Sequence, residues 1–170
     1  MNYTIIIDTE TTGLTHEPDA RPWQIAALVL NEDLTQIASC VIEGCPDVMN
    51  ENAQEALSFS HKTVADIQRL PPLSQSLPAL VSFLNAIPNA KLTAYNIPFD
   101  RVMLGRVGIT THDDQWGPCV KQLAATYNGH PTRLIEISKQ FGIPHDRAHD
   151  ALSDCITTAA VLRRLTVRGL

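Results

Sequence analysis

Apolar residues near the amino terminus fall into three short runs that are typical of buried strands. Residues 3–8 form the first run. The segment QIAALVLNEDLTQIASCVIE, residues 24–43, holds two more, joined through the polar letters NED around Asp33. Apolar runs separated by a polar turn signal indicate a β-hairpin. The pattern therefore predicts that the chain opens with three antiparallel strands.

The apolar spacing then changes to a helical period. Residues 44–72 read as irregular or weakly helical, and residues 91–96 (KLTAYN) as a short strand. Helices are predicted over 76–87, 96–108, 120–127, 132–143 and about 150–168. In the last of these, the predicted apolar stripe consists of Leu152, Cys155, Ile156, Ala159 and Leu162. Strands followed by helices, with one more strand among them, predict a mixed α/β sheet covered by helices.

Composition narrows this picture. The chain has 170 residues, 44% of them apolar, so a single domain over residues 1–170 with one sizeable core is expected. The net charge of −5 argues against coating nucleic acid by electrostatics alone. Four scattered cysteines without a C-x-x-C pair favour free thiols over a zinc site. Without a signal peptide or an apolar run of membrane-spanning length, a cytoplasmic protein with no membrane partner is expected.

The first strand ends in an unusual way, with the stretch IIIDTETTG at residues 5–13. Asp8 and Glu10 are two residues apart, so on an extended chain their side chains point to the same side. Repulsion and desolvation at the edge of a core disfavour two ionised carboxylates, and a bound cation would relieve that conflict. The alternative is a strand that runs into a solvated acidic turn, in which Gly13 supplies a positive φ.

Two further carboxylates stand near helix starts. Asp100 falls in the first turn after YNIPF, where interaction with the helix dipole is a sufficient explanation by itself. Asp154 follows RAHDAL and faces away from the apolar stripe, as an ordinary solvated residue would. Spacing alone would pair Asp150 with Asp154 on one helical face. His149 reaches the same place only if it lies in the loop before the helix, so the residues alone leave this choice open.

Three segments together resemble the DEDDh family of proofreading-type 3′→5′ exonucleases, which are DnaQ-like. DTETTG resembles the first family motif, AYNIPFD the second and AHDALSD the third, in the family's order and over nearly the whole chain. The resemblance implies an RNase H-like α/β fold, a five-stranded mixed sheet of three antiparallel and then two parallel strands. It also selects His149 over Asp150, which then becomes the N-cap of the last helix.

The resemblance implies the catalytic set as well: Asp8, Glu10, Asp100, His149 and Asp154. The four carboxylates would bind two divalent ions, and oxygen ligands suit Mg²⁺ or Mn²⁺. By this analogy Asp8 bridges both ions, Glu10 and Asp154 complete the site of the attacking water, and Asp100 serves the second ion. His149 would take the proton from that water.

Substrate contacts follow from the same likeness. The expected contacts to the terminal nucleotide are Thr11, Leu14, His61, Asn96 and Phe99, although Phe99 reads equally well as core packing. Tyr95 stands where many relatives have histidine, and Lys62 where glycine is usual, which bears on substrate preference. The remaining histidines, His16, His112, His130 and His145, read as surface residues.

These features lead to three hypotheses. The first is a 3′→5′ exonuclease acting on the 3′ end of single-stranded DNA and releasing nucleoside 5′-monophosphates, alone or with a polymerase or repair partner. The second is a 3′→5′ exoribonuclease or oligoribonuclease, which differs in its contacts to the sugar 2′-hydroxyl. The third is a nucleic-acid-binding module without activity, for which the full set of catalytic residues would be unnecessary.

Overall fold

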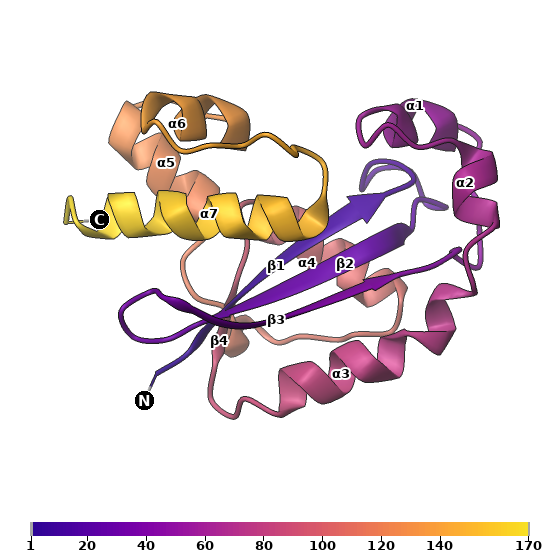
Figure 1. Cartoon of the computed structure of the whole chain (residues 1–170), viewed down its shortest axis with the longest axis horizontal. Helices are drawn as coiled ribbons and strands as arrows, with labels where there is room; N and C mark the ends of the chain where they lie inside the picture. The colour runs from indigo at the N-terminus through magenta and orange to yellow at the C-terminus, as the bar shows by residue number, and fades with distance from the viewer. Residues whose placement is uncertain (1, 170) are drawn as a thin grey trace.

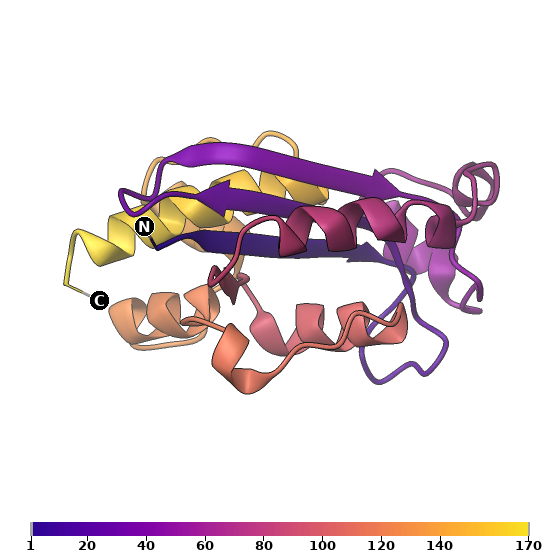
Figure 2. The same ribbon diagram turned by 90° about the horizontal axis from the view of Figure 1, so that it is seen from below.

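The structure, a computed structural model, describes residues 2–169. Strands β1 (Thr4–Thr11), β2 (Pro22–Leu30) and β3 (Gln36–Glu43) follow one another, and β4 (Lys91–Thr93) comes later in the chain. The order across the sheet is β3-β2-β1-β4, with the first three antiparallel and β4 parallel to β1. Figure 2 shows β1, β2 and β3 running side by side. The predicted opening of three antiparallel strands is confirmed.

Both faces of the sheet are covered, which explains why every residue of β2 is buried. On one face, Ile6, Ala26 and Leu28 pack against Cys155 and Ala159 of α7 (Ala151–Thr166). On the other face, helices α3 (Leu77–Asn85) and α4 (Ile97–Arg106) complete the core around Ile5, Ile7, Leu80 and Leu104. Figure 1 shows α7 and α3 on either side of the strands.

The smaller helices flank this layered core. Helices α5 (Val120–Asn128) and α6 (Leu134–Gln140) pack against α7 through a third apolar cluster. Helices α1 (Ala53–Ser58) and α2 (Val64–Gln68) lie in the segment predicted to be weakly helical, and they pack around Trp23 of β2. Two 3₁₀ turns, Leu73–Gln75 and Asp113–Gln115, join the helices. None of the helices within residues 2–169 combines the length and the apolarity needed to cross a lipid bilayer.

The prediction of five strands is wrong for the described residues, since the sheet has four. At the place of a fifth strand, Trp116 forms a single parallel bridge to Leu92, and Gly117 donates its N–H to the Leu92 carbonyl at 2.7 Å. The regular pattern ends after this bridge, and the next main-chain contacts are single hydrogen bonds from the Val120 N–H to the Ala94 carbonyl at 3.2 Å and from the Lys121 N–H to the Tyr95 carbonyl at 2.8 Å. A fifth strand is therefore reduced to one bridge.

Two smaller predictions also need correction. Ile156 was placed in the apolar stripe of the last helix, but it is 45% exposed, and the buried face of α7 is continued by Val161 and Leu165 instead. Gly13 does not supply a positive φ. A Cβ there would lie 2.4 Å from Asn50 Nδ2 and 2.5 Å from Glu17 Oε2, so a close approach of neighbouring side chains favours glycine at this position.

Candidate active site

The site lies where β1 extends beyond its parallel neighbour. β1 pairs with β2 along its whole length but with β4 only through Thr4, Ile5 and Ile6. Asp8 and Glu10, on the same face as Ile6, therefore lie on a stretch of β1 that β4 leaves free. Because the strand continues to Thr11, both carboxylates belong to regular structure and not to a solvated turn.

Asp100 reaches this edge from the other side of the sheet. It lies in the first turn of α4, is 3% exposed, and accepts a hydrogen bond from the Thr9 hydroxyl at 2.9 Å. Thr9 alternates with Asp8 and Glu10 along β1, so its side chain points to the α4 face. The contact explains why Asp100 is buried, and it fixes the start of α4 against β1.

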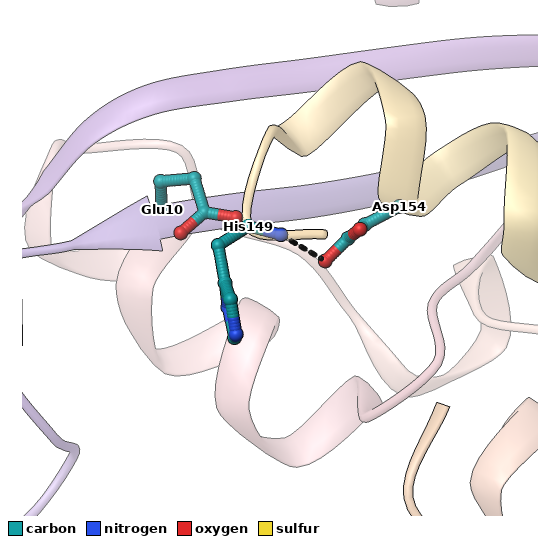
Figure 3. Close-up of side chains that lie close together, drawn as sticks. All are labelled: Glu10, His149 and Asp154. Carbon is teal, nitrogen blue, oxygen red and sulfur yellow. Dashed lines mark hydrogen bonds between the residues drawn. The ribbon is translucent and has the colours of Figure 1, made fainter. Parts of the chain in front are cut away.

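The last helix supplies Asp154, and the loop before it supplies His149. Asp150 is the N-cap of α7, as predicted, because its side chain accepts the Ser153 N–H at 3.0 Å. His149 adopts a φ of 65°, which turns the chain into the site immediately before the helix. Its main-chain N–H donates to Asp154 Oδ2 at 3.4 Å (Figure 3). The loop position that the spacing argument required for His149 is thus the one the chain adopts.

Glu10, His149 and Asp154 form the tightest group of the site. One potential ligand atom from each lies within 4.8 Å of the others, and Figure 3 shows the three side chains around a common space. Carboxylate oxygens and an imidazole nitrogen are donors that divalent metal ions accept. The residues present therefore fit a metal ion in their donor chemistry.

Electrostatics support the same conclusion. Burial, followed by the charges of Asp100, Asp154 and Glu10, raises the pKa of Asp8 well above its ordinary value. Burial and the charges of Asp154 and Asp100 raise the pKa of Glu10 to about 8. Burial raises the pKa of Asp100 to about 7, although hydrogen bonds from Thr9 act in the opposite direction. Carboxylates that repel one another in this way are stabilised in their charged form by a bound cation.

A cavity of about 660 Å³ opens beside these groups. It is lined by all five predicted catalytic residues and by Thr11, Leu14, Asn96 and Phe99 of the predicted substrate contacts. His61 is exposed and is not among the residues that line the cavity. Lys62, beside it, is exposed as well. The structure thus brings together the predicted site residues except His61.

The segment that contains His61 meets the cavity through another residue, Phe59. Phe59 lines the cavity, is 60% exposed, and its ring lies 5.6 Å from the His149 ring, centroid to centroid, at 48° between the planes. The prediction missed Phe59 because the family resemblance pointed to His61, two positions later. An aromatic residue close to a predicted substrate contact was the available signal.

Tyr95 has mainly a structural environment. It is 8% exposed, and its hydroxyl donates to the Thr132 carbonyl at 2.6 Å, which ties it to the segment that precedes α6. Burial raises the pKa of this phenol above its ordinary value. Tyr95 also lines the cavity, so the departure from histidine changes the wall of the site without removing a carboxylate.

His145 was predicted to lie on the surface, and this prediction is wrong. Its side chain is 6% exposed and its Nε2 lies 2.6 Å from Asp154 Oδ1. The other three histidines named as surface residues, His16, His112 and His130, are exposed. The spacing of the third motif drew attention to His149, whereas His145 lies nine residues before Asp154 and has no helical relation to it.

Comparisons with known proteins agree with this geometry. A family model described as an exonuclease, RNase T, matches residues 5–162. No curated protein sequence matches the chain closely enough to count as a relative. Among solved structures, the complex of Escherichia coli exonuclease I with single-stranded DNA has a TM-score of 0.81 and 22% identity. The match covers 99% of this chain and 41% of that protein, so the chain spans about two fifths of its length.

Two other solved structures show the same fold at lower identity. A 3′-exonuclease that recognises the histone mRNA stem-loop has a TM-score of 0.77 and 17% identity, over 98% of this chain and 82% of that one. Cell-death related nuclease 4 has a TM-score of 0.73 and 15% identity, over 98% and 64%. The predicted RNase H-like architecture is confirmed by these similarities, with four strands in place of five.

Proposed function

The chain belongs to the DEDD-type exonuclease family, and on this premise we propose that it is a metal-dependent 3′→5′ exonuclease acting on single-stranded DNA. Each turn of the reaction would release a nucleoside 5′-monophosphate. The observation that carries the proposal is the convergence of four carboxylates and His149 on one cavity. One exonuclease domain over residues 1–170 is part of the proposal, supported by the extent of the family match.

Metal binding follows from the donor set. Asp8, Glu10, Asp100 and Asp154 offer only oxygen ligands, which favours Mg²⁺ or Mn²⁺ over zinc. As the family resemblance implies, these residues would hold two ions: Asp8 would serve both, Glu10 and Asp154 the first, and Asp100 the second. When bound, such ions supply Lewis-acid stabilisation of the charge that develops on the phosphate and lower the pKa of water.

We assign the role of general base to His149. It is exposed to the cavity, and it lies close to Glu10 and Asp154. An imidazole is the side chain best suited to accept a proton near neutral pH. In this role His149 takes the proton of the attacking water, and the Phe59 ring beside it limits the positions of the imidazole.

The cavity wall suits the end of a nucleic-acid strand. Leu14 and Phe99 present apolar surface to the cavity, and aromatic side chains stack on bases with little regard to sequence. Asn96 and Thr11 add polar groups for a sugar or phosphate. The structural match to an exonuclease I complex with single-stranded DNA favours DNA as the substrate.

RNA is the second candidate substrate. The match to a 3′-exonuclease that recognises the histone mRNA stem-loop covers 82% of that chain. The match to the DNA-bound exonuclease I covers 41% of that protein. An exoribonuclease would bind the 2′-hydroxyl of the terminal nucleotide. The module without activity has least support, because the catalytic residues are present and converge. A polymerase or repair partner and the cytoplasmic location stay predictions.

A ladder assay tests the proposal. Purified protein is mixed with 5′-labelled single-stranded DNA and RNA of one sequence, with Mg²⁺ or with EDTA. Stepwise shortening from the 3′ end that requires Mg²⁺ and is lost in Asp8→Ala is the expected result, and the faster substrate decides between DNA and RNA. Shortening that persists in EDTA would contradict the proposed mechanism, and no shortening of either strand by folded protein would favour a binding module.

A further inference from the structure

His145 has no assigned role in the proposed reaction, yet it is buried against one of the carboxylates. Its side chain is 6% exposed and that of Asp154 is 13% exposed, with 2.6 Å between Nε2 and Oδ1. The Nδ1 atom of the same ring is buried and has no hydrogen-bond partner among residues 2–169. Within the described chain, the contact with Asp154 is therefore the polar interaction that accounts for the burial of this ring.

The direction of the hydrogen bond follows from the chemistry of the two groups. A charged carboxylate can only accept, so Nε2–H of His145 donates to Oδ1 of Asp154. The second oxygen, Oδ2, accepts the main-chain N–H of His149 at 3.4 Å. Both carboxylate oxygens are thus bound by one loop, residues 143–149, which restrains the plane of the carboxylate.

The same loop carries the proposed general base in a costly conformation. A non-glycine residue with a positive φ, such as His149 at 65°, lies in a sparsely populated region of backbone conformation and persists where the surrounding structure enforces it. The hydrogen bond from His145 joins the loop to α7 four residues before His149. It therefore restrains the carboxylate and the base together.

We propose that His145 is a positioning residue, which orients the Asp154 carboxylate for metal binding and holds the His149 loop over the site. The inference rests on the proposed function, because Asp154 needs this orientation only if it binds a metal ion. Groups that hydrogen-bond to a metal-ligating carboxylate typically contribute roughly 10–100-fold to metal affinity or activity when tested by mutation. An effect of that size is expected here.

Three variants separate this role from packing. His145→Leu keeps an apolar volume but removes the donor, whereas His145→Gln places an amide N–H near the position of Nε2 and restores a donor. His130→Leu, at an exposed histidine between α5 and α6, is the matched control. Mn²⁺ binding is measured by electron paramagnetic resonance of the free ion, without nucleic acid, so that the readout does not depend on turnover. Thermal unfolding in EDTA reports the stability of each variant.

The expected result is a roughly 10–100-fold weaker Mn²⁺ affinity in His145→Leu, partial recovery in His145→Gln and no change in His130→Leu. The Mg²⁺ concentration for half-maximal nuclease activity should rise in parallel. If His145→Leu does not fold, two other variants are compared: His145→Gln places a donor near the position of Nε2, and His145→Asn places one near that of Nδ1. Mn²⁺ affinity that is retained with glutamine but not with asparagine supports the proposal.

A melting temperature that falls while Mn²⁺ affinity stays at the wild-type value would overturn the inference and leave the nuclease proposal intact. If His145→Leu binds Mn²⁺ more weakly but the wild-type protein cleaves neither DNA nor RNA, the inference is supported and the proposed substrate is not. A wild-type protein that binds no Mn²⁺ would overturn both.

Discussion

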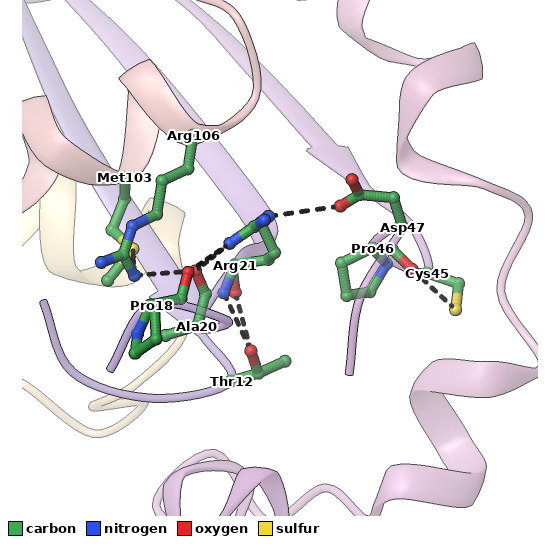
Figure 4. Close-up of polar contacts among 9 residues, drawn as sticks. All are labelled: Thr12, Pro18, Ala20, Arg21, Cys45, Pro46, Asp47, Met103 and Arg106. Atoms are coloured by element: carbon green, nitrogen blue, oxygen red, sulfur yellow. Dashed lines mark hydrogen bonds and ion pairs between the residues drawn. The ribbon is translucent and has the colours of Figure 1, made fainter. Parts of the chain in front are cut away.

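The carboxylates at the free edge of β1 and the arginines beside the β1–β2 loop lie at the same end of the sheet and differ in how their charges are compensated. Arg106 donates to the main-chain carbonyls of Thr15 and Ala20 at 2.7 and 2.8 Å. Arg21 donates to the carbonyls of Pro18 and Ala20, and its Nε lies 3.3 Å from Asp47 Oδ1 (Figure 4). We call Arg21 and Arg106 the arginine pair. Its charges face acceptors, whereas Asp8 and Glu10 face other carboxylates.

The difference separates two tasks within one cavity. The arginine pair holds the loop of residues 12–21, which carries Leu14 and Glu17 into the cavity wall. Its contacts stabilise the folded chain without any ligand. The carboxylates destabilise the metal-free chain, because burial and repulsion oppose their ionisation. The arginine pair therefore shapes the cavity, and the carboxylates are arranged to bind a cation.

The largest expected effect comes from removing a carboxylate. Asp8→Asn should reduce nuclease activity by at least about 10³-fold, since metal ions contribute several kcal/mol of transition-state stabilisation. The same change should raise the melting temperature in EDTA, because it removes a buried charge among like charges. Activity and unfolding are measured on one preparation. Asp33→Asn, at an exposed turn, is the control, and a loss of stability in Asp8→Asn would count against the comparison.

The stability of the metal-free protein should depend on pH in a stated direction. The folded-state pKa of Glu10 is about 8 and that of Asp100 about 7, both above the ordinary values of 4.5 and 3.8. A raised folded-state pKa gives stability that is complete below the ordinary pKa and is lost as the pH rises through the folded-state pKa. Between pH 5 and 8.5 in EDTA the melting temperature should fall, by at least roughly 5 °C.

Saturating Mg²⁺ sharpens this test, because metal binding stabilises the charged carboxylates and should remove most of the fall. Differential scanning calorimetry at each pH, with and without Mg²⁺, gives both curves. A metal-free melting temperature that rises over the same interval would show that the carboxylates are not in conflict.

The arginine pair should show the opposite behaviour. Arg106→Met keeps the apolar stem but removes the donors to Thr15 and Ala20, at a cost of about 1–2 kcal/mol for charged hydrogen bonds that are partly exposed. Since the loop carries Leu14, KM should rise several-fold with a smaller change in kcat. Arg164→Met, at an exposed position of α7, is the matched control. If Arg106→Met unfolds at the wild-type temperature both in EDTA and in Mg²⁺, the contacts of Arg106 do not contribute to the stability of the folded chain.

The smallest expected effect is that of Asp150→Ala on stability. Comparing this variant with Asp154→Ala separates the roles of the two residues. Asp150→Ala removes the N-cap of α7 and should cost about 1 kcal/mol, or roughly 2–4 °C in melting temperature. The Mn²⁺ affinity of Asp150→Ala should change little, whereas Asp154→Ala should abolish the binding of one of the two ions. Comparable losses of metal affinity in the two variants would reopen the pairing of Asp150 with Asp154 that spacing alone favours.

Sequence reasoning worked where local patterns control structure. The alternation at Asp8 and Glu10, the N-cap at Asp150 and the loop position needed for His149 all depend on short-range geometry, and each agrees with the structure. The burial of His145 and the place of Phe59 at the cavity depend on contacts between segments distant in the chain. A single sequence carries no direct signal for such contacts. The count of five strands, which the family resemblance implied, also depends on pairing between distant segments.

Asp100 also contacts β1 where β4 ends. It accepts the hydrogen bond of the Thr9 hydroxyl at 2.9 Å, on the stretch of β1 that β4 leaves free. A lineage that abandons catalysis is free to lose Asp8 or Glu10. Replacing Asp100 would leave the buried Thr9 hydroxyl without its acceptor. In descendants without activity, Asp100 should therefore be the last of the four carboxylates to disappear.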